Sequence, residues 1–233
     1  MSAYTVGIVA GSGIDLAPLL TERHEAISFR SIFPMPSQVV EGHGGMFVKG
    51  SCRMLRVVVQ MGRLHVYEGL SYSSVVRTVD TMASWGVKTI IFTNAVGGLR
   101  PEMKPGDLAA IDSFQVCPFT GWKLRNDTFR TGPVVGGCDH TGKYMWVSGP
   151  NYETRAEIGA LQAMGGAVVG MSTAPEVYRC RTLGIRSSVV SCITNNCTRA
   201  QVLTHEQVLK TAGAASARLC GLLRAYLTTI ASR

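Results

Sequence analysis

The chain has 233 residues, of which 46% are hydrophobic and 16% charged, and 23 Lys and Arg against 15 Asp and Glu give a formal net charge of +8. This composition excludes intrinsic disorder, which goes with few apolar and many charged residues, and the length excludes a disulfide-framework mini-protein. No stretch offers the roughly 18 apolar residues of a membrane span, because Arg224 and two threonines interrupt the closest one, residues 219–231. We therefore expect one large domain over residues 1–233.

The positive charge is spread thinly along the chain. No two Lys or Arg are adjacent, so the basic balance indicates a small anionic substrate or a basic surface rather than a nucleic-acid partner. The seven Cys form no CxxC pair and the five His show no ligand spacing, which argues against a metal site. Because the first basic residue is Arg23, we expect no positively charged leader. We expect a cytoplasmic protein with reduced cysteines and no membrane partner.

Runs rich in Val and Ile, apolar at nearly every position, predict strands that are buried on both faces. They alternate with stretches of helical periodicity, which predicts an α/β fold with a mixed, mostly parallel central sheet flanked by helices. A Gly- and Pro-rich stretch, residues 131–142, predicts a surface loop. In chain order, the expected strands are 5–10, 55–60, 87–93, 107–111, 144–148, 167–170 and 186–194, and the expected helices are 71–85, 154–164, 173–183 and 204–230.

Three expected helices begin with a capping box, in which Ser or Thr is followed three residues later by Glu or Gln. The pairs are Thr154 with Glu157, Thr173 with Glu176, and Thr204 with Gln207. A polar residue, Glu153, Ser172 or His205, lies next to each of these starts. Since ligands of open α/β sheets bind where strands end and helices begin, the three starts are predicted to border a site.

Two strand ends indicate an anion site. Gly11-Ser12-Gly13 follows the first expected strand, and such a turn leaves backbone N–H groups open to an anion, although a plain tight turn would use the same residues. Arg63 and His65 follow the second strand one residue apart, so in extended backbone both side chains point the same way. The planar fork of Arg suits phosphate oxygens and His adds a second donor; a surface ion-pair cluster is the alternative.

Four later strand ends carry groups that suit an aromatic or polar ligand. Thr93–Gly98 contains paired glycines, and Gly149–Thr154 places an aromatic ring and a carboxylate before a helix. Gly170–Thr173 offers a hydroxyl at a helix start, and Ile193–Asn196 offers amides that donate and accept hydrogen bonds. Each segment is also compatible with a structural turn.

Together these segments resemble the trimeric purine nucleoside phosphorylases, a branch of the nucleoside phosphorylase family shared with methylthioadenosine phosphorylase. The resemblance implies the α/β fold of that family, a homotrimer, and phosphorolysis of purine (deoxy)ribonucleosides to free base and pentose 1-phosphate in purine salvage. Inorganic phosphate would be a co-substrate, with no cofactor. The matching segments run in family order: GSG 11–13, GHGG 42–45, GRLHVYEG 62–69, TNAVGGL 93–99, GPNYETRAE 149–157, VGMSTAPE 169–176, ITN 193–195 and HEQVL 205–209.

The resemblance also implies a role for each candidate residue. Phosphate would be held by Ser12, Arg63, His65, the backbone at Ala95 and Ser172, with His43 nearby. The ribose would be lined by Tyr67, Met171 and His205. The purine would be held by Glu153 and Asn195, with Tyr152, Val96, Gly97 and Thr194 around it. Asn195, Glu153 and His65 would be the catalytic residues.

The pair of Glu153 and Asn195 implies a 6-oxopurine such as the base of inosine or guanosine. Glu153 would accept from N1–H, and Asn195 would donate to N7 and O6, stabilising the charge that the departing base acquires. Family members that act on 6-aminopurines carry Asp at the position of Asn195. The alternatives are a methylthioadenosine or adenosine phosphorylase, a catalytically silent nucleoside-binding protein and, from charge alone, a nucleic-acid binder.

Two segments depart from the family pattern. The chain is shorter than usual between Asp112 and Trp146, where the family carries an aromatic residue that reaches a neighbouring subunit's site. Phe119, Trp122 and Phe129 are the candidates for that residue. The lid segment, residues 196–203, is also compressed.

Overall fold

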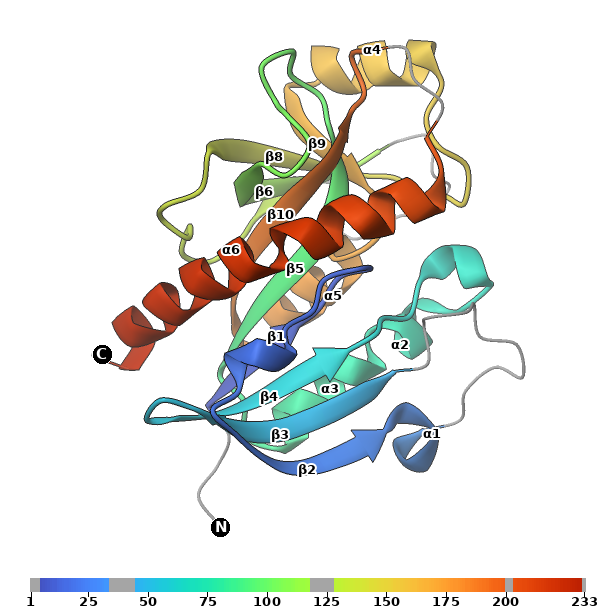
Figure 1. Ribbon diagram of the computed structural model, residues 1–233. Coiled ribbons are helices and arrows are strands. Elements are labelled where there is room, and N and C mark those ends of the chain that lie inside the picture. Colours follow the sequence, from blue (N-terminus) through green and yellow to red (C-terminus); the bar gives the residue numbers. More distant parts are fainter. Residues whose placement is uncertain (1–4, 34–44, 118–127, 200–202, 232–233) are drawn as a thin grey trace.

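The protein, described by a computed structural model over residues 5–33, 45–117, 128–199 and 203–231, is built around a ten-stranded mixed sheet (Figure 1). The strands in chain order are β1 (Val6–Val9), β2 (Glu22–Ser28), β3 (Met46–Cys52), β4 (Leu55–Met61), β5 (Thr89–Gly98), β6 (Leu108–Val116), β7 (Thr128–Arg130), β8 (His140–Trp146), β9 (Gly166–Gly170) and β10 (Arg186–Asn196). The predicted class, a mixed sheet flanked by helices, is confirmed.

Helices cover both faces of the sheet. They are α1 (Phe29–Ile32), α2 (Tyr72–Val75), α3 (Arg77–Ser84), α4 (Arg155–Ala163), α5 (Ala174–Thr182) and α6 (His205–Ala231), with 3₁₀ turns η1 (Ala17–Leu19) and η2 (Val66–Glu68). Along β5, Ile90 and Phe92 pack in one cluster with α3 and α5, whereas Ile91 between them packs in another with α6. The alternation follows from the pleat of the strand, and it explains why the run is apolar at every position.

Four neighbouring strands, β4, β1, β5 and β10, run parallel to one another. Their register pairs Val9 with Gln60 on one side and with Phe92 on the other. Strands that run parallel end at the same edge of the sheet, so the segments after these four strands meet there.

The other half of the sheet closes on itself. β5 pairs with β10 and with β9, and the ring is completed by the pairings β10–β6, β6–β8 and β8–β9. Closure removes exposed strand edges, and the ring encloses the fully buried Tyr144, Trp146 and Phe114.

Strands β2, β3 and β7 were not predicted from the sequence. β2 is exposed at nearly every position and β3 is interrupted by Lys49 and Gly50, so neither carries a continuous apolar run. Strand β8 begins at His140, inside the expected loop of residues 131–142. The expected helix over residues 71–85 is two helices, α2 and α3, which are divided at Val76 (φ −84°, ψ −3°).

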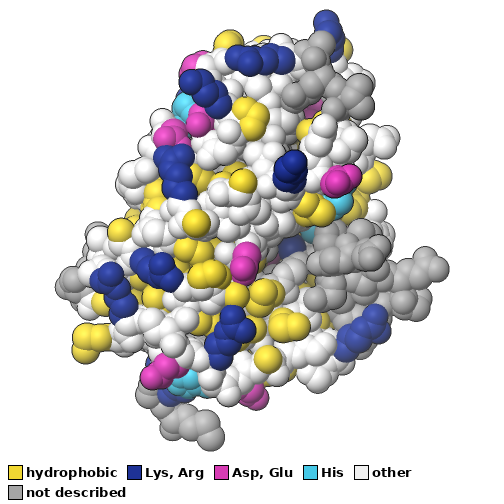
Figure 2. All heavy atoms as spheres, in the orientation of Figure 1, with side chains coloured by type: hydrophobic (Ala, Val, Ile, Leu, Met, Phe, Trp, Pro, Cys, Tyr) yellow, Lys and Arg dark blue, Asp and Glu magenta, His cyan; other side chains and the backbone are white. Residues whose placement is uncertain are grey.

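The surface carries its positive charge in separate places. Figure 2 shows that the Lys and Arg side chains are scattered over this face, several of them beside Asp or Glu. Over the described ranges, no helix is long and apolar enough to cross a membrane, and no group of His, Cys, Asp and Glu could hold a metal ion. All seven cysteines are free, and all but Cys138 and Cys197 are buried.

Candidate active site

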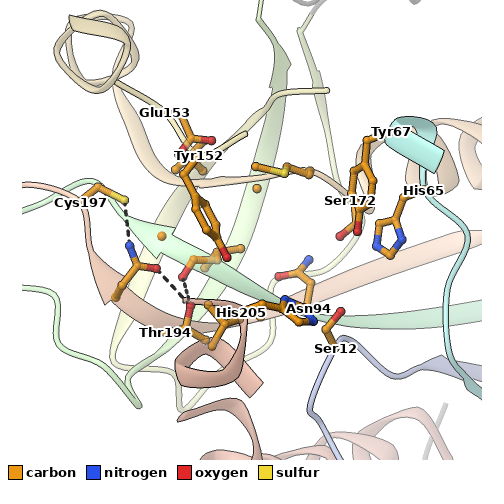
Figure 3. A pocket seen from close by; sticks show the side chains of 18 of the residues that line it. Ser12, His65, Tyr67, Asn94, Tyr152, Glu153, Ser172, Thr194, Cys197 and His205 are labelled. Atoms are coloured by element: carbon orange, nitrogen blue, oxygen red, sulfur yellow. Dashed lines mark hydrogen bonds between the residues drawn. The ribbon is translucent and has the colours of Figure 1, made fainter. Parts of the chain in front are cut away.

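A pocket opens at the carboxyl ends of β1, β4, β5 and β10, with the segments after β8 and β9 and the start of α6 around it (Figure 3). It encloses about 720 Å³, part of which is open to solvent. Every sequence-predicted site residue that the structure describes lines it: Ser12, Arg63, His65, Tyr67, Ala95, Val96, Gly97, Tyr152, Glu153, Met171, Ser172, Thr194, Asn195 and His205. His43 lies outside the described residues.

One end of the pocket is built around the buried guanidinium of Arg63. Its Nε lies 3.1 Å from a carboxylate oxygen of Glu176, and its Nη1 donates to the hydroxyl of Ser172 at 3.1 Å. Its Nη2 is buried without a hydrogen-bond partner among the described residues. Because a buried donor without a partner is costly, this nitrogen is suited to an oxygen of a bound anion.

Glu176 is itself fixed from its own helix. It lies in the first turn of α5, it is buried, and it accepts a hydrogen bond at 3.2 Å from the backbone N–H of Thr173. Burial raises the pKa of this carboxyl, and the charge of Arg63 opposes that rise. The expected capping pair at this helix thus also orients the arginine of the site.

His65 adds a second group at the same end of the pocket. Its Nδ1 lies 2.8 Å from the carboxylate of Glu68, and its ring stacks on that of Tyr67 with 4.6 Å between the centroids. The contact with Glu68 and the stacking on Tyr67 fix the ring of His65 at this end of the pocket. Figure 3 shows His65, Tyr67 and Ser172 together on this side.

The end of β1 approaches β5 closely. A Cβ at Gly11 would lie 2.5 Å from the Cα of Asn94, and the backbone N–H of Gly11 donates to Thr93 at 3.2 Å. Only glycine allows this approach, which brings Ser12 beside Asn94 in the pocket. Asn94 donates to the Thr173 hydroxyl at 2.8 Å.

The opposite end is formed by the last residues of β10. The pairing of β10 with β5 shifts register at Thr194: Ile193 pairs with Val96, and Asn195 pairs with Gly97. Successive side chains of a regular strand point to opposite faces, but this bulge allows both Thr194 and Asn195 to line the pocket. Asn196, by contrast, is held by the carbonyls of Arg100, Pro101 and Met103.

Glu153 faces the pocket from the segment that precedes α4. Burial raises the pKa of its carboxyl above the usual range. The capping box of the helix, with Thr154 N–H donating to Glu157 at 2.7 Å and Glu157 N–H donating to Thr154 at 3.3 Å, fixes the chain directly after it. Tyr152 is 47% exposed and lies beside Glu153 at the pocket mouth (Figure 3).

Tyr67, Met171 and His205 line the pocket between or beside these two ends. Gly149, which has a positive φ of 70°, packs against two of them: a Cβ there would meet the sulfur of Met171 at 2.5 Å and the ring of Tyr67 at 3.1 Å. His205 is the first residue of α6, whose capping box between Thr204 and Gln207 is present.

Five pocket residues were not predicted: Asn94, Val169, Gly170, Cys197 and Val208. All but Cys197 lie in or next to the motifs quoted from the sequence, so proximity to those motifs was a usable signal. Cys197 follows β10 and belongs to the lid segment, residues 196–203, in which no single residue was assigned to the site.

Phe129, one of three aromatic candidates for contact with a neighbouring subunit, is buried within its own chain. It lies in β7, is 3% exposed and stacks on Phe114 with 5.3 Å between the ring centroids. Its side chain therefore does not project from this chain. The other two candidates, Phe119 and Trp122, lie outside the described residues.

The sequence model of the phosphorylase superfamily matches residues 5–134 and 139–228. Purine nucleoside phosphorylase 1 of Geobacillus stearothermophilus is 33% identical, over 97% of this chain and 91% of that protein. Purine nucleoside phosphorylase of Mycobacterium leprae is 35% identical, over 95% and 88%. The crystal structure of Schistosoma mansoni purine nucleoside phosphorylase with inosine has a TM-score of 0.82 at 30% identity, over 96% of this chain and 89% of that one.

The fold and the position of the pocket, at the edge where four parallel strands end, define a protein of the nucleoside phosphorylase class. The matches extend over nearly the whole chain, so they include every strand that lines the pocket. The chain belongs to the phosphorylase superfamily and, within it, to the purine nucleoside phosphorylases.

Proposed function

We propose that this enzyme splits 6-oxopurine ribonucleosides and deoxyribonucleosides, such as inosine and guanosine, with inorganic phosphate. The products would be the free purine and ribose or deoxyribose 1-phosphate. The observation that carries the proposal is the separation of two chemistries in one pocket. Arg63 contacts Ser172 at one end, and Asn195 contacts Cys197, which lies on the side of Glu153, at the other.

At the phosphate end, Arg63 supplies the charge and the open Nη2, while Ser12, Ser172 and His65 supply further donors. Glu176 and Ser172 hold the other nitrogens of the guanidinium, so little freedom is lost when phosphate binds. His43, outside the described residues, remains a predicted contact.

At the purine end, Glu153 accepts from N1–H of a 6-oxopurine, and the amide of Asn195 donates to N7 and O6. Tyr152, Val96, Gly97 and Thr194 surround the base. Tyr67, Met171 and His205 hold the sugar between the base and the phosphate.

The chemistry needs positioning and electrostatics rather than a nucleophile from the chain. As the glycosidic bond breaks, the sugar gains positive charge and the base gains negative charge. Phosphate held beside Arg63 stabilises the sugar cation and then attacks it, and the donor on Asn195 stabilises the leaving base. Because both charges are largest in the transition state, these contacts increase the rate and not merely binding.

The direct test is to incubate the purified protein with inosine, with and without phosphate, and to measure hypoxanthine. We expect release that requires phosphate, also from guanosine and deoxyinosine. Failure with every 6-oxopurine nucleoside would overturn the proposal. A panel that includes adenosine and methylthioadenosine separates the alternative substrates, and nucleoside binding without turnover would indicate a silent binding protein.

Substituting Asn195→Asp gives a second test of base recognition. A carboxylate cannot donate to O6 but can accept from a 6-amino group, so the ratio of kcat/KM for inosine to that for adenosine should fall by about tenfold or more, as expected when one charged hydrogen bond is exchanged. An unchanged ratio would contradict the role assigned to Asn195.

We further propose that the enzyme assembles as a homotrimer. Light scattering should then give a mass three times that of the chain, and a monomer mass would contradict this.

A further inference from the structure

Cys197 lies at the purine end of the pocket and has no part in the function proposed so far. Its sulfur accepts a hydrogen bond from Nδ2 of Asn195 at 3.4 Å, and Oδ1 of the same amide lies 3.2 Å from the hydroxyl of Thr194 (Figure 3). Both ends of the amide that would read the base are therefore held by this chain.

The contact with Thr194 cannot by itself decide which way the amide faces. The Thr194 hydroxyl has one hydrogen, yet it lies 3.2 Å from two acceptors, the carbonyl oxygen of Val96 and Oδ1 of Asn195. If the amide were reversed, Nδ2 could donate to Thr194 and Thr194 could donate to Val96. A hydroxyl serves either orientation, so the orientation is decided at the other end.

At the other end of the amide, the sulfur of Cys197 and the charge of Glu153 both favour the orientation in which Nδ2 of Asn195 faces them. The sulfur accepts from Nδ2, and the negative charge of Glu153 reaches this position, since after burial it is the cause that raises the pKa of the Cys197 thiol to about 11. A carboxylate favours the N–H end of a nearby amide dipole over its oxygen end. At neutral pH the sulfur is thus a neutral thiol beside an amide donor.

The backbone holds the thiol in place. The N–H of Cys197 donates to the carbonyl of Gly98 at 2.9 Å, and a Cβ at Gly97 would lie 2.4 Å from the sulfur and 3.5 Å from Nδ2 of Asn195. Glycine at position 97 is therefore required for the thiol to reach the amide. The contact is built by three backbone positions and is not an accident of one flexible side chain.

We propose that Cys197 is a positioning residue that fixes the amide of Asn195 with its nitrogen toward Glu153, and so helps determine base specificity. This inference rests on the function proposed above. In this orientation the amide offers the base the N–H that the thiol does not accept, which suits the oxygen of a 6-oxopurine. Without the thiol the amide can reverse and offer its oxygen, which suits a 6-amino group.

The test is a double-mutant cycle on the purified enzyme, with Cys197→Ala, Asn195→Ala and the double variant, measured with inosine and adenosine. Cys197→Ala should lower kcat/KM for inosine by about fivefold, which is the effect of losing one ordinary hydrogen bond. The loss should be mainly in kcat. The ratio of kcat/KM for inosine to kcat/KM for adenosine should also fall. Cys197→Ser, which keeps a group that donates and accepts, should restore most of the loss. In the Asn195→Ala background, Cys197→Ala should have no further effect.

Cys138→Ala is the matched control, because it removes the other half-buried thiol, which lies outside the pocket, and it should leave the ratio unchanged. Additive effects in the cycle, or a Cys197→Ala variant with the wild-type ratio, would overturn the inference while leaving the proposed function intact. A wild-type enzyme with no turnover would instead count against the proposed function. The same cycle measured on the Kd for hypoxanthine then decides the inference, with additivity again overturning it.

Discussion

At the scale of single residues, Arg63 is the residue on which the proposed phosphate site depends. It contacts Glu176 through Nε and Ser172 through Nη1, and its Nη2 has no partner among the described residues. These two contacts and the open Nη2 use the fixed fork of Arg, and the point charge of Lys cannot reproduce them.

Substituting Arg63→Lys should therefore raise KM for phosphate by about tenfold or more, the effect of one lost charged hydrogen bond. The Kd for hypoxanthine, measured by calorimetry, should stay within about twofold, as is usual for a change that leaves its contacts in place. Arg130→Lys, at an exposed position of β7, is the control. Equal effects of both variants would contradict the role of Arg63.

The raised pKa of Glu153 predicts how activity depends on pH. In the proposed role, the carboxylate above its pKa accepts from N1–H of a 6-oxopurine; below it, the protonated acid is a weaker acceptor but can donate to N1 of adenosine. Because burial raises this pKa, kcat/KM for inosine should fall with decreasing pH, starting above the usual carboxyl range, while adenosine is affected less or improves. Glu153→Gln should remove the difference between the two pH profiles. Parallel profiles in the wild type would contradict this role.

At the scale of elements, a bulge in β10 and the start of α4 position the side chains that are proposed to bind the purine. The bulge at Thr194 turns both Thr194 and Asn195 toward the pocket, and the capping box of α4 fixes the chain that carries Glu153. The irregular backbone thus lies at the pocket, whereas the regular parts of β10 and α4 pack in the core.

Substituting Thr154→Ala removes the cap of α4. We expect a loss of about 1 kcal/mol in stability and a decrease in Tm of about 2–4 °C, with KM for phosphate unchanged because that end lies on other elements. The measurement is the Tm of the variant. The control is Thr182→Ala, which changes an exposed threonine at the last residue of α5. Equal Tm values for the two variants would indicate that the cap carries no stability.

At the scale of the whole molecule, the reactivity of the seven free cysteines measures how well the chain is packed. Five are buried, and in the remaining two, Cys138 and Cys197, burial raises the pKa of the thiol to about 11. Their thiolate fraction at neutral pH is therefore small.

A thiol reagent should accordingly react slowly with two thiols in the native protein and with all seven after unfolding in denaturant. Saturating hypoxanthine should protect Cys197 but not Cys138, as read by peptide mass spectrometry. Rapid reaction of more than two native thiols would contradict the described packing.

Much of the fold could be predicted from the sequence, because buried strands such as β1, β4, β5 and β10 need continuous apolar runs and helices such as α4 and α6 carry their own capping residues. Strands β2 and β3 could not, since they are stabilised by pairing with neighbours and not by an apolar pattern. The division of the expected helix at Val76 was not predicted either, because the apolar periodicity continues across it.

The sequence alone, through motifs tied to strand ends, determined that the chain has a phosphate-and-purine chemistry and which side chains are candidates for it. The tertiary structure decided what those side chains do to one another: the pairing of Arg63 with Glu176, the bulge at Thr194 and the contact of Asn195 with Cys197. The physical reason is that residue type and local spacing are properties of the chain, whereas the orientation and pKa of a side chain depend on neighbours that are distant in sequence and meet only in the folded protein.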